Sequence, residues 1–139
     1  MLFRIIYTSR ASRFFESAEM RELCHVAAAN NRRNGLTGLL LYDGVRFLQA
    51  LEGDHDNVIS VMRRIADDKR HYDMTYAYRD RAPHREFPEW SMDAPFELGD
   101  DAQVFLEKVK SDVELVSDAS LKALFIGFAR LASSGRNRA

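Results

Sequence analysis

The sequence has almost no means of holding itself together by covalent or metal cross-links. Cys24 is its only cysteine, so no disulfide can form within the chain, and this favours a reducing compartment. A structural zinc site would need more cysteine or clustered histidine. The four histidines are instead scattered along the chain: His25, His55, His71 and His84. We therefore expect no metal, and a fold stabilised by one hydrophobic core, which 139 residues are enough to form.

Long apolar runs and an excess of one charge are also absent. No stretch approaches the roughly 18 apolar residues of a membrane helix, and the apolar run at 1–7 is too short for a signal peptide. The formal net charge of −1 gives no field that would favour nucleic acid or an acidic membrane as a partner. The expectation is a soluble, cytoplasmic protein of ordinary composition, with 46% hydrophobic and 29% charged residues.

What the sequence does contain is an alternation of strand and helix patterns. Runs of apolar, β-branched and aromatic residues predict strands at 2–8, 36–42, 45–51, 73–79 and 89–93. Asp43-Gly44 suits a tight hairpin turn between the second and third strands. Ser17 is expected to cap a first helix, and Asp54 or Asp56 a second. This order is the ferredoxin-like pattern with one extra strand, so we predict an α+β fold with a sheet of about five strands.

The last third of the chain predicts two amphipathic helices, at 101–113 and at 118–134, the second capped by Ser117 or Asp118. Their apolar stripes are Ala102, Phe105, Leu106, Val109 and Val113 in the first, and Leu121, Leu124, Phe125, Phe128 and Leu131 in the second. We expect both helices to cover the sheet face opposite the first two helices, as a helical extension (96–139) of one domain (1–95). The second stripe could also serve as an interface, although packing on the protein's own sheet is favoured.

Two asparagines interrupt the apolar stripe of the first helix. Asn30 and Asn31 follow Leu23 and Cys24 by seven positions, so a helix that continues would point both amides inward. A buried amide left unpaired costs on the order of 1–3 kcal/mol. The alternative is that the helix ends here and the asparagines are cap or turn residues before Gly35.

A glutamine interrupts the inward face of the strand at 45–51. Alternation places Gln49 between Phe47 and Leu51 on one face, where its amide needs a polar partner. The first strand supplies a candidate, because Tyr7 lies on a face shared with apolar side chains. A Tyr–Gln hydrogen bond that merely fills a core is the commoner use of such a pair.

Four charged residues gather at the end of the second helix: Arg64, Asp68, Arg70 and His71. Cations at this position complement the helix dipole, and such a face is usually only solvated. Together with the inward tyrosine, glutamine and asparagines, however, these residues outline a polar-edged slot between two helices and a sheet. A planar heterocycle with several carbonyls and ring nitrogens would satisfy all of them.

With these residues in view, the chain resembles the BLUF family of flavin photoreceptors. The resemblance covers about the first two-thirds of the chain, in order and close to the family's spacing. The segments that carry it are IIYTSRAS at 5–12, NNRRNGLTGLLLYDG at 30–44, RFLQALEGD at 46–54, RRIADDKRH at 63–71 and FPEWSM at 87–92.

The resemblance implies a flavin site and a role for each matching residue. Tyr7 would be the photochemical tyrosine, Gln49 the switching glutamine, and Trp90 and Met92 the strand-five pair near that glutamine. The residues implied to hold the flavin, beside Tyr7 and Gln49, are Asn30, Asn31, Arg64, Asp68, Arg70 and His71. The resemblance favours FAD, with FMN as the alternative. Ser9 fits the family's Y-x-S pattern but is given no role.

The implied activity is light sensing without catalysis. Tyr7 is neutral at pH 7 and can give an electron and a proton to a photoexcited flavin, and Gln49 can exchange its donor and acceptor ends to redraw the hydrogen bonds. About 45 residues after Met92 cannot house a cyclase or phosphodiesterase. We therefore expect the signal to reach an unidentified partner protein, or to change self-association as a homo-oligomer.

Two other functions compete with this interpretation. An acylphosphatase-like enzyme would need an anion-binding loop after the first strand, yet the stretch from Ser9 to Ser17 contains no glycine. A flavin-free ligand-binding or dimerisation module would have no need of Tyr7 together with Gln49.

Overall fold

The computed structural model describes residues 1–93 and 102–136, with the side chains of 1–93 and 102–132. Its elements along the chain are β1 (Leu2–Ala11), α1 (Ser17–Arg33), β2 (Thr37–Tyr42), β3 (Arg46–Asp54), α2 (His55–Ala66), β4 (His71–Arg81), β5 (Trp90–Asp93), α3 (Ala102–Asp112) and α4 (Ala119–Arg136). The predicted order of elements is confirmed, with differences of a few residues at their ends. None of the described helices is long and apolar enough to span a bilayer.

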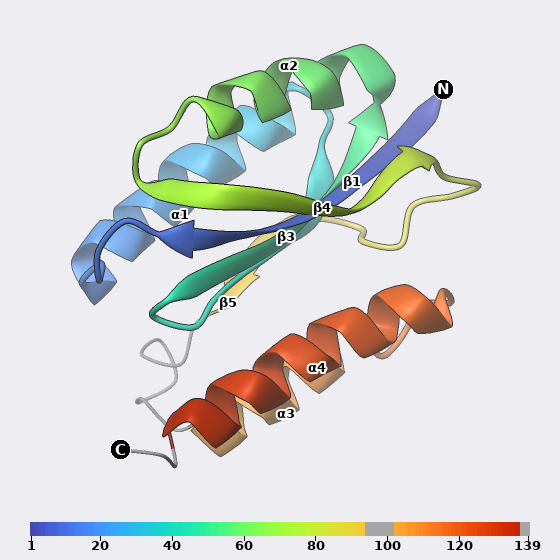
Figure 1. Ribbon diagram of the computed structural model, residues 1–139. Coiled ribbons are helices and arrows are strands. Elements are labelled where there is room, and N and C mark those ends of the chain that lie inside the picture. Colours follow the sequence, from blue (N-terminus) through green and yellow to red (C-terminus); the bar gives the residue numbers. More distant parts are fainter. Residues whose placement is uncertain (94–101, 137–139) are drawn as a thin grey trace.

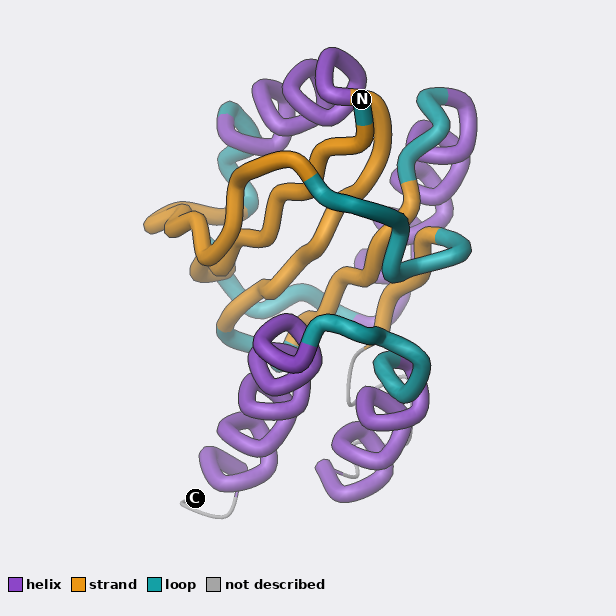
Figure 2. Tube along the Cα trace, turned by 90° about the vertical axis from the view of Figure 1, so that its right-hand side faces the viewer, coloured by secondary structure: helices purple, strands orange, loops and turns teal. Residues whose placement is uncertain are grey.

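The strands form one sheet in the order β4-β1-β3-β2-β5. All neighbours are antiparallel except β2 and β5, which run parallel. Helices α1 and α2 cover one face of this sheet, and α3 and α4 cover the other (Figure 1). Figure 2 shows the same layers from the side. The predicted α+β architecture, with a pair of helices on each face, is therefore confirmed.

Local sequence explains where α1 begins and ends, with one correction. The residue that caps α1 is Glu16 and not Ser17, because the Glu19 carboxylate accepts the Glu16 N–H at 3.2 Å and Ser17 already lies within the helix. At the other end, Asn34 is the C-cap and Gly35 follows with a φ of 65°. Glycine adopts this left-handed conformation without the steric cost that other residues bear.

The connection between β2 and β3 is longer than the expected two-residue turn. It spans residues 43–45, because β3 begins only at Arg46. The Asp43 carboxylate accepts the backbone N–H groups of Val45 and Arg46 at 2.9 and 2.6 Å. A side chain that satisfies the turn's own backbone in this way stabilises a three-residue loop.

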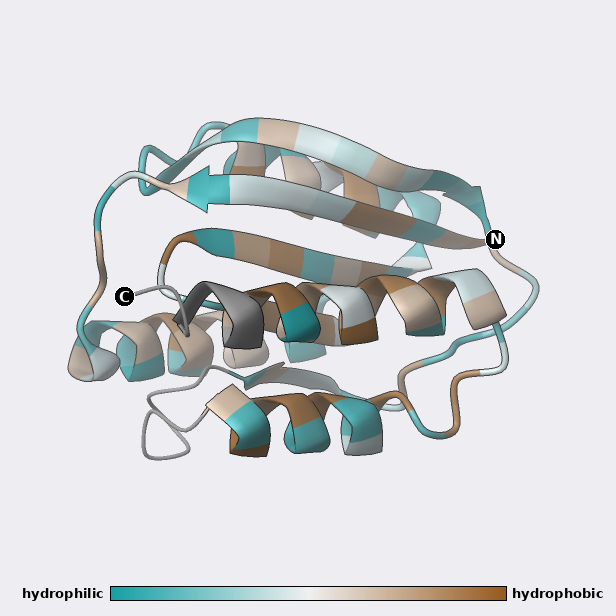
Figure 3. Ribbon diagram, turned by 60° about the horizontal axis from the view of Figure 1, so that its bottom comes forward, coloured by the Kyte–Doolittle hydropathy of each residue, from teal (hydrophilic) through white to brown (hydrophobic). Residues whose placement is uncertain are grey.

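Both faces of the sheet are packed, but by different clusters. Leu39 and Leu41 of β2 point into the apolar core beneath α3 and α4, whereas Leu40 between them joins a cluster on the α1 side. This confirms that the strand is covered on both faces. Most residues of the predicted stripes of α3 and α4 fill the apolar core beneath these two helices, with Phe105 and Phe125 at its centre. Leu131 is an exception, because it is 58% exposed and lies outside that core. Figure 3 shows apolar and polar residues alternating along both helices.

A buried ion pair anchors the segment between β4 and β5. Arg4 Nη2 of β1 lies 2.7 Å from Glu52 Oε2 of β3, and the two side chains are 3% and 0% exposed. The Glu52 carboxylate also accepts the backbone N–H groups of Glu86 and Phe87, both at 2.9 Å. Its buried oxygens are thus satisfied, and the chain is fixed to the sheet shortly before β5 begins.

Candidate functional site

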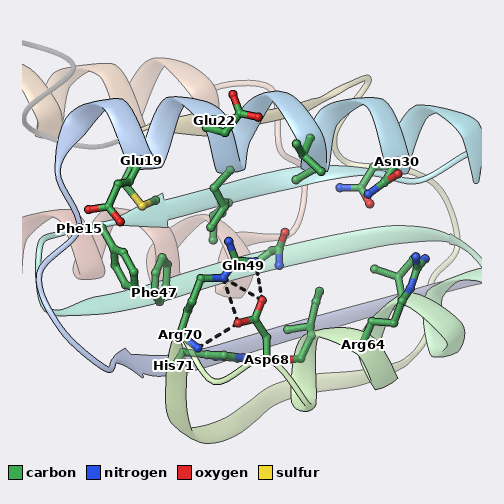
Figure 4. A pocket seen from close by; sticks show the side chains of 18 of the residues that line it. Phe15, Glu19, Glu22, Asn30, Phe47, Gln49, Arg64, Asp68, Arg70 and His71 are labelled. Atoms are coloured by element: carbon green, nitrogen blue, oxygen red, sulfur yellow. Dashed lines mark hydrogen bonds and ion pairs between the residues drawn. The ribbon is translucent and has the colours of Figure 1, made fainter.

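A cavity of about 520 Å³ lies between α1, α2 and the sheet. All eight residues predicted to bind the cofactor line it: Tyr7, Asn30, Asn31, Gln49, Arg64, Asp68, Arg70 and His71. Trp90 of the predicted strand-five pair lines it as well. Figure 4 shows Asn30 and Arg64 at one end of this pocket, Phe15 and Glu19 at the other, and Gln49 between them. Met92 instead packs with the cluster that contains Leu40. The structure therefore brings together side chains from six elements that are distant in the sequence.

Sheet register places the predicted tyrosine and glutamine opposite each other. Tyr7 of β1 pairs with Gln49 of β3, and both are only 4% exposed. Gln49 Nε2 donates to Tyr7 Oη at 2.7 Å, and Trp90 Nε1 donates to Gln49 Oε1 at 3.1 Å. Both ends of the amide are thus engaged. Of the strand-five pair, it is Trp90 that lies next to the glutamine.

The phenol of Tyr7 is held in its neutral form. Burial raises the pKa of Tyr7 well above its usual value. The hydrogen bond from Gln49 lowers this pKa by a smaller amount, and the negative charge of Asp68 raises it by less still. Because Tyr7 Oη accepts the hydrogen bond from Gln49, the phenolic hydrogen can be donated to another acceptor.

The two asparagines lie inside α1, not at its end. The helix runs on to Arg33, so the interpretation of Asn30 and Asn31 as cap residues is wrong. Asn31 is buried at 4% exposure, and Asn30 Oδ1 accepts a hydrogen bond from Arg33. Their amides offer donors and acceptors to a ligand along one wall of the pocket.

The charged residues after α2 form the opposite edge of the pocket. Arg70 Nη2 lies 2.5 Å from Asp68 Oδ2, and the hydrogen bonds from Arg70 lower the pKa of Asp68, with burial opposing them. His71 lies with its ring centre 6.1 Å from that of Tyr7. Within the predicted cluster, Asp68 and Arg70 thus pair with each other, and His71 lines the pocket beside Tyr7.

Ser9 has a structural part that the sequence did not suggest. His71 Nε2 lies 2.5 Å from the carbonyl oxygen of Ile65. A carbonyl can only accept, so this nitrogen carries the hydrogen, and Nδ1 accepts from Ser9 Oγ at 2.7 Å. The Ile65 carbonyl thereby sets the tautomer of His71, and Ser9 orients its ring. The Y-x-S spacing was the available signal, because it places Ser9 on the same face of β1 as Tyr7.

Apolar residues complete the pocket, and sequence reasoning named none of them as ligand contacts. The side chains of this kind include Phe15, Leu23, Leu40, Phe47 and Val61. Apolar walls with a few amide and phenol groups suit a flat, polar-edged ring system such as a flavin. Asn30, Asn31, Tyr7 and Gln49 would hold its polar edge.

Comparison with known proteins gives consistent results. The family model described as "Sensors of blue-light using FAD" (BLUF) matches residues 2–93. The blue light- and temperature-regulated antirepressor BluF of Escherichia coli is 32% identical over 123 residues, which are 85% of this chain and 30% of that protein. The chain spans less than a third of the length of the curated relatives that it matches.

Solved structures share the fold as well. A structure of Klebsiella pneumoniae BlrP1 with FMN and cyclic diGMP has a TM-score of 0.72 at 26% identity, and covers 90% of this chain and 34% of that one. The dark-state structure of BlrB, a BLUF protein, has a TM-score of 0.66 at 28% identity and covers 96% of both chains.

Proposed function

Because the chain belongs to the BLUF family of blue-light sensors, we propose that it is a photoreceptor that holds a flavin non-covalently between α1 and α2. The observation that carries this proposal is the line of hydrogen bonds from Trp90 through Gln49 to Tyr7 beside the pocket. In the described part of the chain, no other group of residues combines a neutral phenol, an amide that can exchange its donor and acceptor ends, and a ligand-sized cavity.

The chemistry of the proposed switch begins at Tyr7. When bound, a flavin excited by blue light supplies a strong oxidant. The raised pKa of Tyr7 keeps its phenol protonated. Loss of an electron makes a phenol O–H strongly acidic, so Tyr7 would give both its electron and its proton to the bound flavin. Gln49 is within hydrogen-bonding distance of the phenol oxygen. We assign to Gln49 the rearrangement that follows movement of this proton.

The indole of Trp90 makes the two orientations of Gln49 unequal. An indole N–H can only donate, so it is satisfied when Gln49 Oε1 faces it. A rotated amide would present its NH2 group to the indole, and two donors would then face each other. Rotation of Gln49 therefore breaks the contact with β5, which suits the transmission of a signal through that strand.

We propose FAD as the flavin and keep FMN as the alternative. The family description names FAD, whereas one related structure holds FMN. The polar groups that would hold the isoalloxazine edge are Asn30, Asn31 and Gln49, and Arg64 at the pocket end supplies a cation for a phosphate. Mass spectrometry of the flavin released from the purified protein distinguishes the two.

We also propose that residues 1–95 sense light and that 96–139 pass the signal to a partner protein or a second copy of the chain, without catalysis by this chain itself. The arrangement of α3 and α4 on the face away from the pocket supports this division. The antirepressor relative supports a protein partner. An acylphosphatase-like activity is disfavoured because the loop between β1 and α1, residues 12–16, contains no glycine that could form an anion-binding turn.

The test of the proposed function is the absorption spectrum of the purified protein before and after a blue flash. We expect a flavin band that shifts slightly to the red and returns in the dark. Tyr7→Phe should keep the flavin but lose this cycle, whereas Tyr76→Phe, which changes the tyrosine paired with Tyr7 across β4, should keep both. An unchanged red shift in Tyr7→Phe, or no flavin even after reconstitution with FAD, would contradict the proposal.

A further inference from the structure

The last residue of β5 faces away from the flavin pocket. Side chains alternate along a strand, so Trp90 points toward the pocket and Asp93, three positions later, points toward the opposite face. There β5 contacts α3, and Asp93 is only 9% exposed. A carboxyl group at this depth needs a partner.

The partners of Asp93 lie on α3 and carry opposite charges. Lys108 Nζ is 3.6 Å from Asp93 Oδ2 and 2.5 Å from Asp112 Oδ1. Because one Nζ atom contacts both carboxyl groups, the side chains of Asp93 and Asp112 lie close to each other. Yet Oδ2 of each aspartate is buried without a hydrogen-bond partner when both are ionised.

One proton resolves this arrangement. Two carboxylates and one ammonium group leave one negative charge in excess around two buried oxygens that lack a hydrogen-bond partner. A single proton shared by the carboxyl groups removes this excess charge and allows one carboxyl group to donate to the other. The pKa of Asp93 is raised to about 7, mainly by burial and also by the neighbouring carboxyl group of Asp112, while Lys108 opposes both. The geometry and the charges thus both favour one proton held by the Asp93–Asp112 pair.

We infer that Asp93 and Asp112 share one proton and so form a pH-dependent latch, the carboxyl latch, that holds the end of β5 against α3. Below neutral pH the protonated pair joins the strand to the helix. As the pH rises, the proton leaves and two carboxylates repel each other across the same contact. Among the described residues, the charged groups that face Asp93 are Lys108 and Asp112, and its neighbour on β2 is the uncharged Leu41.

The carboxyl latch lies on a short path from the proposed switch. Trp90 binds Gln49 on the pocket face, and Asp93 of the same four-residue strand binds α3 on the other face. A displacement of Trp90 would therefore pull on the latch. This use of the latch as an output joint rests on the proposed function, whereas its existence does not.

The first test measures unfolding by urea in the dark between pH 5 and 8, on the full chain. A native-state pKa above the unfolded value stabilises the protein at low pH, and this stabilisation is lost as the pH rises toward about 7. The unfolding constant of the natural sequence should therefore rise, relative to that of Asp93→Asn, by about tenfold per pH unit between pH 5 and 6.5.

Two further variants show whether the proton is shared. Asp112→Asn should reduce the pH dependence, because its amide can donate to an ionised Asp93. Glu107→Gln removes an exposed carboxylate from the same helix and should leave the dependence unchanged. Equal pH dependence in the natural sequence and Asp93→Asn would overturn the latch, and an unchanged dependence in Asp112→Asn would overturn the sharing.

The second test measures amide hydrogen exchange of α3 in the dark and under blue light. At pH 6 light should increase exchange in α3, and at pH 8, where the latch is already open, the increase should be smaller. If the flavin shows its red shift but α3 does not respond to light, the latch is not an output joint. If there is no red shift, the proposed function fails, but the urea measurement still decides on the latch.

Discussion

The two faces of the sheet are covered in different ways. Beneath α3 and α4 the sheet meets a continuous apolar core, in which Phe105 and Phe125 are fully buried. Beneath α1 and α2 it meets a cavity of about 520 Å³ edged by Tyr7, Gln49 and Asn31. One face of the five-stranded sheet is therefore closely packed by apolar side chains, and the other borders a cavity of ligand size.

This difference indicates that one face of the sheet mainly supplies stability and that the other mainly supplies the ligand site. Close packing on the α3–α4 face supplies the rigidity against which small movements on the other face can be transmitted. The pocket face gives up part of its own packing, so a ligand there should contribute stability that the chain lacks by itself. Substitutions on the two faces should differ in kind, in stability on one and in photochemistry on the other.

The largest effect on stability is expected from Phe125→Ala. Phe125 is 0% exposed, and removal of a buried aromatic ring costs about 3–5 kcal/mol in the free energy of unfolding. Urea unfolding measures this loss. Leu131→Ala on the same helix is the control, because Leu131 is 58% exposed and its truncation should cost less than about 0.5 kcal/mol. A similar cost for both variants would mean that α4 does not form the core described.

The next effect should come from the flavin itself. At a free concentration one hundred times its Kd, a ligand that binds only the folded chain stabilises it by about 2.7 kcal/mol. We expect urea unfolding with and without added flavin to show this difference in the natural sequence. The same increment should appear in Phe125→Ala, since changes at separate sites add. A much smaller increment in that variant would show that the two faces are coupled.

A smaller cost, with a complete loss of switching, is expected for Gln49→Leu. Leucine leaves Trp90 Nε1 without its acceptor. A fully buried donor without a partner costs about 1–3 kcal/mol, and because Trp90 is only half-buried we expect a cost at the lower end of this range. The variant should bind flavin and lose the reversible red shift in a flash experiment. Retention of reversible switching would show that the amide is not the relay.

The smallest effect is expected for Asp68→Asn at the pocket edge. Asp68 and Arg70 are 29% and 54% exposed, and a partly solvated ion pair contributes less than about 1 kcal/mol. The hydrogen bonds from Arg70 lower the pKa of Asp68, so this contribution is fully present above the ordinary aspartate pKa and is lost as the pH falls through the lowered folded-state pKa. The difference in unfolding free energy between the variant and the natural sequence should therefore be smaller at pH 3 than at pH 7.

Much of the fold could be predicted because its signals are local. Alternation placed Gln49 and Tyr7 on inward faces, helical spacing placed Asn31 on the buried side of α1, and the resemblance to the BLUF family is confirmed by the family match. What escaped prediction depends on contacts between distant segments. The Arg4–Glu52 pair and the meeting of Asp93 with α3 arise from sheet register and layer packing, which local patterns do not encode.

The edge position of β5 has an evolutionary meaning. Among the described strands β5 pairs only with β2, so it closes one side of the sheet without supporting another strand. Natural selection could therefore alter the length, tilt or charge of whatever follows Asp93 while the ladder formed by β4, β1, β3 and β2 keeps its shape. The same light-sensing fold could in this way signal to different partner proteins through changes in the edge strand β5 and in the segments that follow it.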